Sequence, residues 1–376
     1  MPPVTVALLI VGGVAVVGGI VAFALRSRLV ATMLLAFGAL ALVSGWLYPV
    51  TSRADALRTG GLAAGSVVAL YALWLNDRRR RVDEDRQELE RQRQDLESAR
   101  AEHDRERAAD ERFLRAVELL GHDTDQVRVG ALHALAGLAR ARPTYTQDVL
   151  DVICSYLRRP FEHPEYVTTR GAGEPPELAE SNRWRVVRLT AQRLLADLLP
   201  TVDTPDAPAY DLDLTGATLE YCDLSYRVIG TLRARALKMY QSNSFHHCEI
   251  RGDAWFTASE TWGRFLVHDT RFLGQAWFSQ FRAHDKVDFA RTEFAGDSKF
   301  ANGTFNGPVT FKEAVFGKNV DFANSKFTNK LDLRVASDGL TGRTRAMTIS
   351  LTHEHHLPPG WVVDPSRGDD MGLVRA

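Results

Sequence analysis

Residues 287–327, VDFARTEFAGDSKFANGTFNGPVTFKEAVFGKNVDFANSKF, place a phenylalanine at intervals that alternate between five and six residues. An amphipathic α-helix repeats every 3.6 residues and a half-buried strand every two, so neither element explains this spacing. The phenylalanines are Phe289, Phe294, Phe300, Phe305, Phe311, Phe316, Phe322 and Phe327. The stretch therefore predicts a repeating unit with one large apolar residue in each copy.

The same register extends from Leu214 to Leu333, and among its 23 central positions only Thr261 is polar. The positions are five apart as far as Met239, and beyond it steps of six and five alternate. A small or apolar residue stands two positions before most of them, as at Ala276. A chain that turns a corner after about five residues explains both series, because the large side chain then points to the axis and the small one fills the corner. The central positions are Leu214, Leu219, Leu224, Ile229, Ala234, Met239, Phe245, Ile250, Phe256, Thr261, Val267, Phe272, Phe278, Ala283, Phe289, Phe294, Phe300, Phe305, Phe311, Phe316, Phe322, Phe327 and Leu333.

These units resemble the pentapeptide-repeat family, as ATLEY, CDLSY, VDFAR, TEFAG and VDFAN show. The resemblance covers residues 212–333 and implies a right-handed quadrilateral β-helix with four units in each coil. The additional residue at every second unit departs from the family pattern and predicts coils of about 22 residues, five to six in number, stacked at about 4.8 Å. We expect a distorted corner or a bulge between Arg227 and Met239 and around Thr261 and Ala283, where the repeat is weaker.

Three nearly uncharged segments open the chain, at residues 4–25, 29–50 and 57–76, the last with only Arg58. Each is long enough to cross about 30 Å of hydrocarbon, and a cleavable signal peptide is disfavoured because no basic region precedes the first segment and a second follows at once. Basic residues at 26, 28 and 78–81 mark one side, so the positive-inside rule predicts an external N-terminus and cytoplasmic residues 77–376. No Asp, Glu, Lys or His lies within these segments, so residues 1–76 are interpreted as a membrane anchor, in which Gly61 and Gly65 form a candidate helix-packing pair.

Residues 77–112 form a highly charged segment without Pro or Gly, with opposite charges at i, i+4 spacing. Val82, Leu89 and Leu96 recur every seven residues, but arginines occupy the intermediate core positions. Such a seam favours a solvated single-helix stalk, and the alternative is a weak parallel coiled-coil homodimer held by the membrane spans. Thirteen acids against eleven arginines leave the stalk nearly neutral, which argues against nucleic-acid binding.

Residues 113–200 show the periodicity of buried helices. A helix ends near Gly121, a second opens at Asp123 or Thr124 and buries Val127, Ala131, Ala134, Leu135 and Leu138, and others span residues 148–159 and 183–199, with a loop at 160–176. The VRVGALHALAGL pattern resembles one HEAT or armadillo unit, which implies a short α-helical adaptor. Residues 201–211 are interpreted as a linker, and the order of spans, charged helix, helical block and repeats resembles actinobacterial membrane-anchored pentapeptide-repeat proteins.

After Leu333 the repeat is expected to stop, with Gly339, Thr341 and Gly342 breaking the chain. Residues 334–376 then form either a C-terminal cap or a disordered tail. In the cap, residues 346–374 would cover the last coil with Trp361 or Leu351, residues 371–374 would pair back on the chain, and the 183–199 helix would close the other end.

The sequence contains no motif for catalysis or cofactor binding. His353, His355 and His356 form a histidine cluster and His246 and His247 a pair, yet neither has the acids or cysteines of a metal site, and Cys154, Cys222 and Cys248 are far apart. We therefore predict no catalytic, cofactor-binding or metal-binding residues and no enzymatic activity.

Net charge decides between the two remaining classes of function. The whole chain carries a formal charge of −1, and residues 212–333 contain 14 acidic and 15 basic residues. Some members of the resembled family mimic DNA and act on type II topoisomerases, which requires a strongly acidic rod. The sequence instead favours a non-enzymatic scaffold in the cell membrane that presents a β-helix to a cytoplasmic protein partner, without binding nucleic acid.

Overall fold

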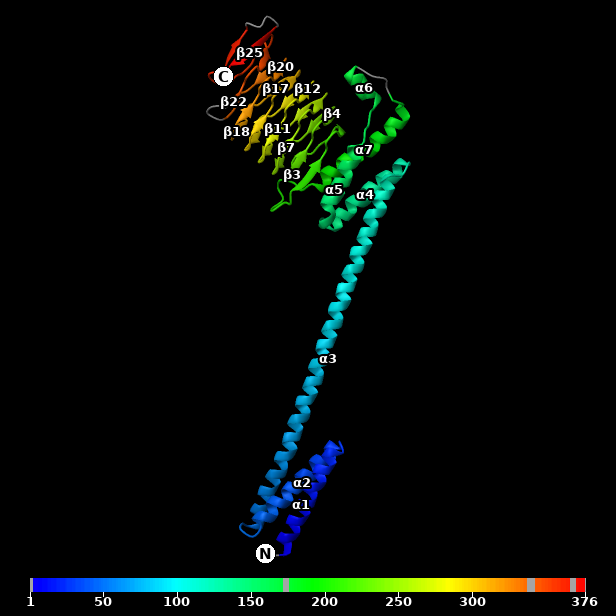
Figure 1. The fold of residues 1–376 in the computed structure, drawn as a ribbon, viewed down its shortest axis with the longest axis vertical. Coiled ribbons are helices and arrows are strands. Elements are labelled where there is room, and N and C mark those ends of the chain that lie inside the picture. Colours follow the sequence, from blue (N-terminus) through cyan, green and yellow to red (C-terminus); the bar gives the residue numbers. More distant parts are fainter. Residues whose placement is uncertain (1–2, 172–175, 337–341, 366–369, 376) are drawn as a thin grey trace. The chain divides into compact units, whose positions relative to one another are not determined.

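The computed structural model describes residues 3–171, 176–336, 342–365 and 370–375, with the backbone alone at 81–85. The chain divides into two compact units, Met1–Arg105 and Glu106–Ala376. The first unit is helical, and the second combines helices with stacked short strands (Figure 1).

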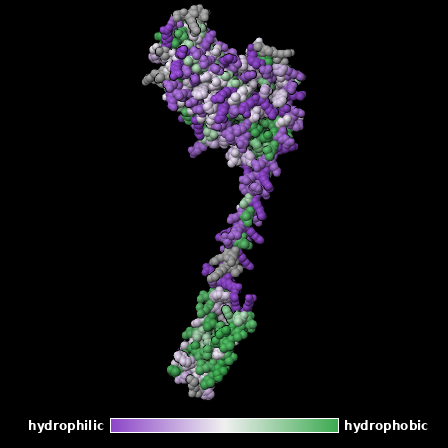
Figure 2. Space-filling view, viewed as in Figure 1, coloured by the Kyte–Doolittle hydropathy of each residue, from purple (hydrophilic) through white to green (hydrophobic). Residues whose placement is uncertain are grey.

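The N-terminal unit contains α1 (Pro3–Ala24), α2 (Arg28–Leu47) and most of α3 (Arg53–Leu120). Three stretches are long and apolar enough to cross a membrane, namely Pro3–Ala24, Arg28–Leu47 and Arg53–Arg80. Their apolar surface stands out in Figure 2. The sequence prediction of three candidate spans is confirmed at this level.

Glycines let the backbones of α1 and α2 approach closely. A Cβ atom added at Gly38 would lie 3.1 Å from the carbonyl oxygen of Gly12, and one added at Gly60 of α3 would lie 2.8 Å from the Leu40 carbonyl oxygen of α2. The sequence predicted such a close approach at Gly61 and Gly65 instead. A Cβ atom added at either of these glycines would meet no neighbouring atom of the described residues within 4 Å. The sequence could not distinguish them, because a helix presents Gly60 and Gly61 about 100° apart.

Helix α3 continues without interruption from the third candidate span through the charged segment, over 68 residues. Its freedom from Pro and Gly after Gly65 explains this continuity, since both residues weaken a helix interior. The Leu89 and Leu96 side chains are exposed, whereas the side chain of Val82 lies outside the described residues. The predicted helical stalk is thus one part of a longer helix.

The helical block of the second unit comprises α4 (Asp125–Ala141), the 3₁₀ turn η1 (Pro143–Tyr145), α5 (Thr146–Leu157), α6 (Pro164–Arg170) and α7 (Leu178–Leu198). Helix α4 buries Leu132, Leu135, Ala136 and Ala139, whereas Ala134, expected in its core, is exposed. Helix α6 lies where a loop was expected, of which residues 172–175 lie outside the described ones. It is short and begins with proline, and His163 accepts a hydrogen bond from the Glu165 amide at its N-terminus.

The repeat region forms a β-solenoid of about six turns. Its outer strands stack in parallel on four sides: β6–β10–β14–β18; β7–β11–β15–β19–β22; β2–β4–β8–β12–β16–β20–β23; and β5–β9–β13–β17–β21, with β3 contributing to the first two sides and pairing with β1. The strands in chain order are β1 Tyr210–Asp213, β2 Thr218–Glu220, β3 Val228–Arg233, β4 Lys238–Tyr240, β5 Asn243–Ser244, β6 Glu249–Ile250, β7 Ala254–Trp255, β8 Glu260–Thr261, β9 Phe265–Leu266, β10 Arg271–Phe272, β11 Ala276–Trp277, β12 Arg282–Ala283, β13 Val287–Asp288, β14 Glu293–Phe294, β15 Ser298–Lys299, β16 Thr304–Phe305, β17 Val309–Thr310, β18 Val315–Phe316, β19 Val320–Asp321, β20 Lys326–Phe327, β21 Leu331–Asp332, β22 Gly342–Arg343, β23 Thr348–Ser350, β24 Val362–Asp364 and β25 Met371–Arg375.

Strand pairing reproduces the change of period seen in the sequence. In the first coil Leu219 pairs with Met239, whereas further along Phe272 pairs with Phe294. The second pair is separated by two more positions of sequence than the first. Coils after Met239 therefore contain the two additional residues that the alternating spacing predicts.

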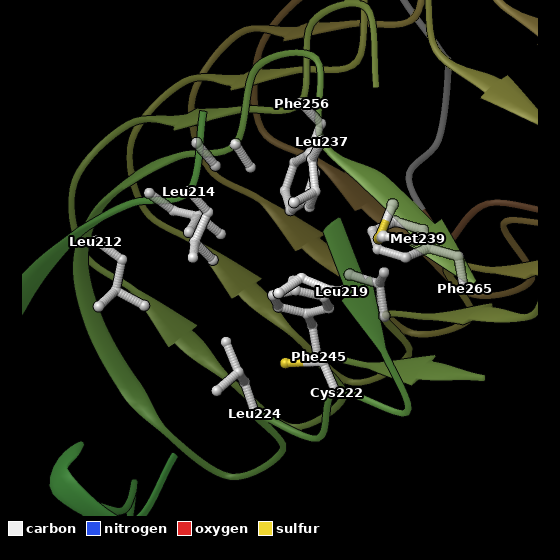
Figure 3. Close-up of a cluster of buried hydrophobic side chains, with 14 of the residues drawn as sticks. Leu212, Leu214, Leu219, Cys222, Leu224, Leu237, Met239, Phe245, Phe256 and Phe265 are labelled. Carbon is white, nitrogen blue, oxygen red and sulfur yellow. The ribbon is translucent and has the colours of Figure 1, made fainter. Parts of the chain in front are cut away.

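Every predicted central position is buried, and the phenylalanines stack from coil to coil. Phe289 and Phe311, for example, lie with ring centroids 5.0 Å apart and planes 9° from parallel. Figure 3 shows how the aliphatic residues of the first coils, including Leu214, Leu219 and Met239, give way to Phe245, Phe256 and Phe265. This ladder is a continuous structural core.

The distortion expected at Thr261 and Ala283 is absent, since both residues pair in the regular register. Compensating side-chain sizes explain the regularity. Phe281, two residues before the small Ala283, fills the core, and its ring lies 6.1 Å from that of Phe305 in the next coil. Gly303, two residues before Phe305, leaves room for that ring, because an added Cβ would lie 2.8 Å from Phe305 Cε2.

Helices α5 and α7 cover the N-terminal end of the solenoid, which extends the expectation for residues 183–199. Arg188 of α7 is buried and donates to the carbonyl oxygens of Leu157, at 2.5 Å, and Thr218, at 2.9 Å. Gln192 accepts from the Glu220 amide at 3.0 Å. The Thr218 and Glu220 contacts satisfy backbone groups at the start of the first coil, whereas the Leu157 contact joins α7 to α5. Burial lowers the pKa of Arg188 to about 10.

The solenoid continues beyond its predicted end at Leu333. Strands β22 and β23 stack in parallel on β19 and β20, and Ile349 pairs with Phe327 in the register of a regular coil. The polar Thr344, which follows Phe322 at the same spacing, hid this register in the sequence, and Gly339 and Thr341 lie outside the described residues. Strand β25 then pairs antiparallel with β23 and β24, closing the third side, and Trp361 lies edge-on to Phe322 at 6.5 Å while Leu351 is exposed.

Candidate functional site

The regular length of the coil places outward-facing residues in ladders on the solenoid surface. One ladder follows β7, β11, β15, β19 and β22, where the paired residues are Trp255, Trp277, Lys299, Asp321 and Arg343. We call these five residues the tryptophan face. The face is aromatic at the end formed by Trp255 and Trp277 and charged at the end formed by Lys299, Asp321 and Arg343.

The tryptophan face contains a shallow groove. It has a volume of about 430 Å³ and is lined by Trp277, Lys299, Asp321 and Arg343 among others. The indole rings of Trp255 and Trp277 lie edge-on, 6.4 Å apart, and the Arg235 guanidinium lies 5.3 Å from the Trp255 ring. Aromatic and arginine side chains of this kind are enriched at the centres of protein interfaces.

A second ladder lies on the side of β4, β8 and β12. Tyr240 stacks on Trp262 at 4.6 Å, and Trp262 stacks on His284 at 5.6 Å. Tyr166 of α6 extends the stack at 3.9 Å, and its hydroxyl donates to Glu220, which also pairs with Arg185. The missed helix α6 thus fastens the helical block to this ladder.

A group of three histidines lies at one corner of the solenoid. One ring nitrogen from each of His246, His247 and His268 lies within 4.8 Å of the others. Nδ1 of His246 is 2.9 Å from Nδ1 of His247, and the rings of His246 and His268 stack at 4.6 Å. Within the described ranges, no other three His, Cys, Asp or Glu side chains bring potential metal-ligand atoms this close together.

Charged and aromatic neighbours surround this histidine corner. Asp269 Oδ2 lies 2.9 Å from His268 Nδ1 and 3.7 Å from His247 Nε2, and Arg291 donates to both oxygens of Asp269, at 2.7 and 2.6 Å. The Arg291 hydrogen bonds lower the pKa of Asp269 to about 2. Burial, followed by the neighbouring His268 and His247, lowers the pKa of His246. Tyr226 stacks on His247 at 4.6 Å.

The sequence paired His246 with His247 but missed His268. The repeat length could have predicted that His268 lies beside His246, because His268 follows His246 by one regular coil. The same reasoning would have aligned Trp255 with Trp277. Outward residues escaped notice because the repeat was recognised from its inward positions.

The THEHH histidines belong to the end of the solenoid. His355 Nδ1 accepts from the Leu331 amide at 3.1 Å, and His356 exchanges backbone hydrogen bonds with Leu331 and Leu333. His353 lies beside Thr352, with Nδ1 3.0 Å from its hydroxyl. These contacts place the segment beside β21, where Asp332 and His356 form a parallel bridge.

The three cysteines are buried in the core. Burial raises the pKa of Cys154, Cys222 and Cys248 to about 12 in each case. Their thiols are therefore protonated at neutral pH and poorly nucleophilic.

Parallel coils with one large inward residue in each unit define a β-solenoid. A family profile described as pentapeptide repeats (9 copies) matches residues 289–337. The match and the solenoid together support a pentapeptide-repeat protein. No curated protein matches the chain, and neither does any solved structure.

Proposed function

We propose that this chain is a non-enzymatic, membrane-anchored scaffold whose tryptophan face binds a protein partner in the cytoplasm. The observation that carries the proposal is the groove beside Trp277, where aromatic, basic and acidic side chains meet on a rigid surface. A flat ladder of this type suits a folded protein surface better than a small molecule, which usually requires an enclosed apolar pocket.

The membrane orientation rests on the distribution of arginines. Arg26, Arg28 and residues 78–81 provide six basic residues on one side of the three candidate spans, against Arg53 and Arg58 on the other. The positive-inside rule then assigns the six to the cytoplasm. Reporter fusions after Asp77 should be active in the cytoplasm and a tag before Val4 should be accessible from outside. The reverse labelling, or recovery of the full chain without detergent, would refute the assignment.

The partner surface can be tested by site-specific photo-crosslinking in native membranes. A photoreactive residue in place of Lys299 should give one discrete adduct, whereas the same residue in place of the exposed Lys312 should not. Trp277→Ala and Arg343→Glu should abolish the Lys299 adduct without changing protein abundance. Equal adducts from both positions, or an adduct that survives both substitutions, would exclude the tryptophan face.

A DNA-mimic activity is the alternative that the family resemblance raises. It requires an excess of negative charge along the solenoid, but residues 212–333 are nearly neutral. Outward ladders that alternate acids with bases, such as Arg271 between Glu249 and Glu293, make the mimicry poorer still. Purified protein should therefore leave type II topoisomerase supercoiling unchanged, and inhibition would favour the alternative.

We also propose a weak homodimer through the spans and α3. Leu89 and Leu96 are exposed apolar residues seven positions apart, and in the described part of the chain open space adjoins Gly61 and Gly65. A Leu89→Cys variant in membranes should form a disulfide-linked dimer on mild oxidation, whereas a Glu90→Cys variant should form much less. Equal crosslinking of the two would argue against a specific helix pair.

A further inference from the structure

We propose that His246, His247 and His268 bind one divalent transition-metal ion, with Zn²⁺ as the reference ion. This site is separate from the tryptophan face and does not depend on partner binding. Three imidazoles on a fixed backbone, with an ionised carboxylate behind them, are the observation that carries the proposal.

The solenoid geometry brings the three rings together. His246 and His268 occupy equivalent positions of consecutive coils, so their rings stack at 4.6 Å with planes 7° apart. His247 follows His246 directly at the same corner, with φ 55°, a left-handed conformation, and its Nδ1 lies 2.9 Å from that of His246. A bound ion would therefore join two neighbouring coils.

The spacing of the nitrogens suits a first-row metal after small side-chain rotations. Tetrahedral coordination with metal–nitrogen bonds of 2.0–2.1 Å places nitrogens about 3.4 Å apart. The three nitrogens now lie within 4.8 Å, with His246 Nδ1 and His247 Nδ1 at 2.9 Å. The side chains of His247 and His268 are 39% and 25% exposed, so rings and solvent can both move there.

The donor type determines which metal ions the site would select. Three imidazole nitrogens select Zn²⁺, Ni²⁺ or Cu²⁺ over Mg²⁺ and Ca²⁺, which prefer oxygen.

Asp269 is a positioning residue in this arrangement. Arg291 holds both of its oxygens, and Oδ2 lies 2.9 Å from His268 Nδ1. A carboxylate in this place fixes the ring orientation of a metal-binding histidine. The three histidines would supply the protein ligands, and water would complete the coordination.

Zinc binding can be measured on the purified full chain in detergent, without a histidine tag and after removal of metals by a chelator. Titration against a chromogenic chelator at neutral pH should reveal one site that is absent from a His246→Ala/His247→Ala variant and at least about tenfold weaker in His268→Gln. Asp269→Asn should weaken zinc binding by about 10–100-fold. His284→Gln is the matched control, because it removes another partly exposed ladder histidine outside the group.

Two further measurements separate binding from folding. Co²⁺ should give visible d–d absorption in the wild type and in His284→Gln but not in the double variant, and a given Zn²⁺ concentration should raise the melting temperature of the wild type more than that of His268→Gln. Far-ultraviolet circular dichroism should be equal for all variants. If the double variant misfolds, His268→Gln still tests zinc binding, because it replaces a partly exposed side chain.

Equal zinc affinity in His268→Gln and the wild type would overturn the proposal. So would a site that His353→Ala removes while His268→Gln leaves it intact, since the ion would then be bound at the end of the solenoid.

Discussion

Replacing Phe311 by alanine removes a ring from the middle of the phenylalanine ladder. The Phe311 side chain is fully buried, stacks on Phe289 at 5.0 Å and contacts Phe300 and Phe322 edge-on at 5.2 and 5.8 Å. Neighbouring rings are fixed by their own coils and cannot collapse into the space. We therefore expect a cavity and a loss of about 3–5 kcal/mol in the free energy of unfolding.

The measurement is thermal and urea unfolding of residues 106–376, which form one compact unit. At roughly 2–4 °C per kcal/mol for domains of 150–250 residues, the melting temperature should fall by about 6–20 °C. Lys312→Ala is the control, because its half-exposed side chain contacts only the neighbouring Glu313, at 3.3 Å, among the described ion pairs. It should change stability by no more than about 0.5 kcal/mol. Equal losses in both variants would show that the inward register is wrong.

Three further perturbations test the corners, a charged ladder and the final edge. Gly263→Ala should strongly lower the melting temperature in the same unfolding assay, because its Cβ would overlap the carbonyl oxygen of Gln241 in the preceding coil, and an unchanged midpoint would contradict this packing. The folded-state pKa of Asp269 is about 2, below its unfolded value, so the ion pair of Asp269 with Arg291 contributes stability above about pH 4 that is lost as pH falls toward 2. The free energy of unfolding of Asp269→Asn should therefore depend less on pH across this interval. A pH profile identical to that of the wild type would refute the contribution. Deleting residues 351–376 removes the hairpin that covers β23 and should cause concentration-dependent association in sedimentation velocity, so a monomeric truncation would show that the hairpin does not protect the edge.

The inward half of the solenoid was predictable from the sequence because one position in each unit must be large and apolar. That constraint made the change from steps of five to alternating steps visible at Met239, and strand pairing confirms it. Where the constraint is relaxed the prediction failed. Thr344 is polar, so the last coil was missed, and Phe281 supplies the volume that Ala283 lacks, so a distortion was expected in a regular coil.

The outward surface was less predictable, because no single residue type is required there. His268 and Trp277 acquire meaning only when they are placed one coil beyond His246 and Trp255. Helix α6 was missed for a different reason. It is only seven residues long and lies within residues 160–176, whose prolines and glycines favoured a loop, and its position depends on Tyr166 stacking against Tyr240, a contact between distant parts of the chain.

Beyond Met239 the offset between paired strands is constant, and this has a consequence for how the protein can vary in length. Insertion of a single residue within a strand would move the side chains that follow it out of their columns unless a corner took up the extra residue, whereas insertion or removal of one entire coil would preserve all columns. The same end caps could then cover solenoids of different lengths without a change in their own contacts. These caps are helices α5 and α7 at one end and the β24–β25 hairpin at the other. Natural length variants of this solenoid should accordingly differ by multiples of one coil, inserted between the helical end and the hairpin end.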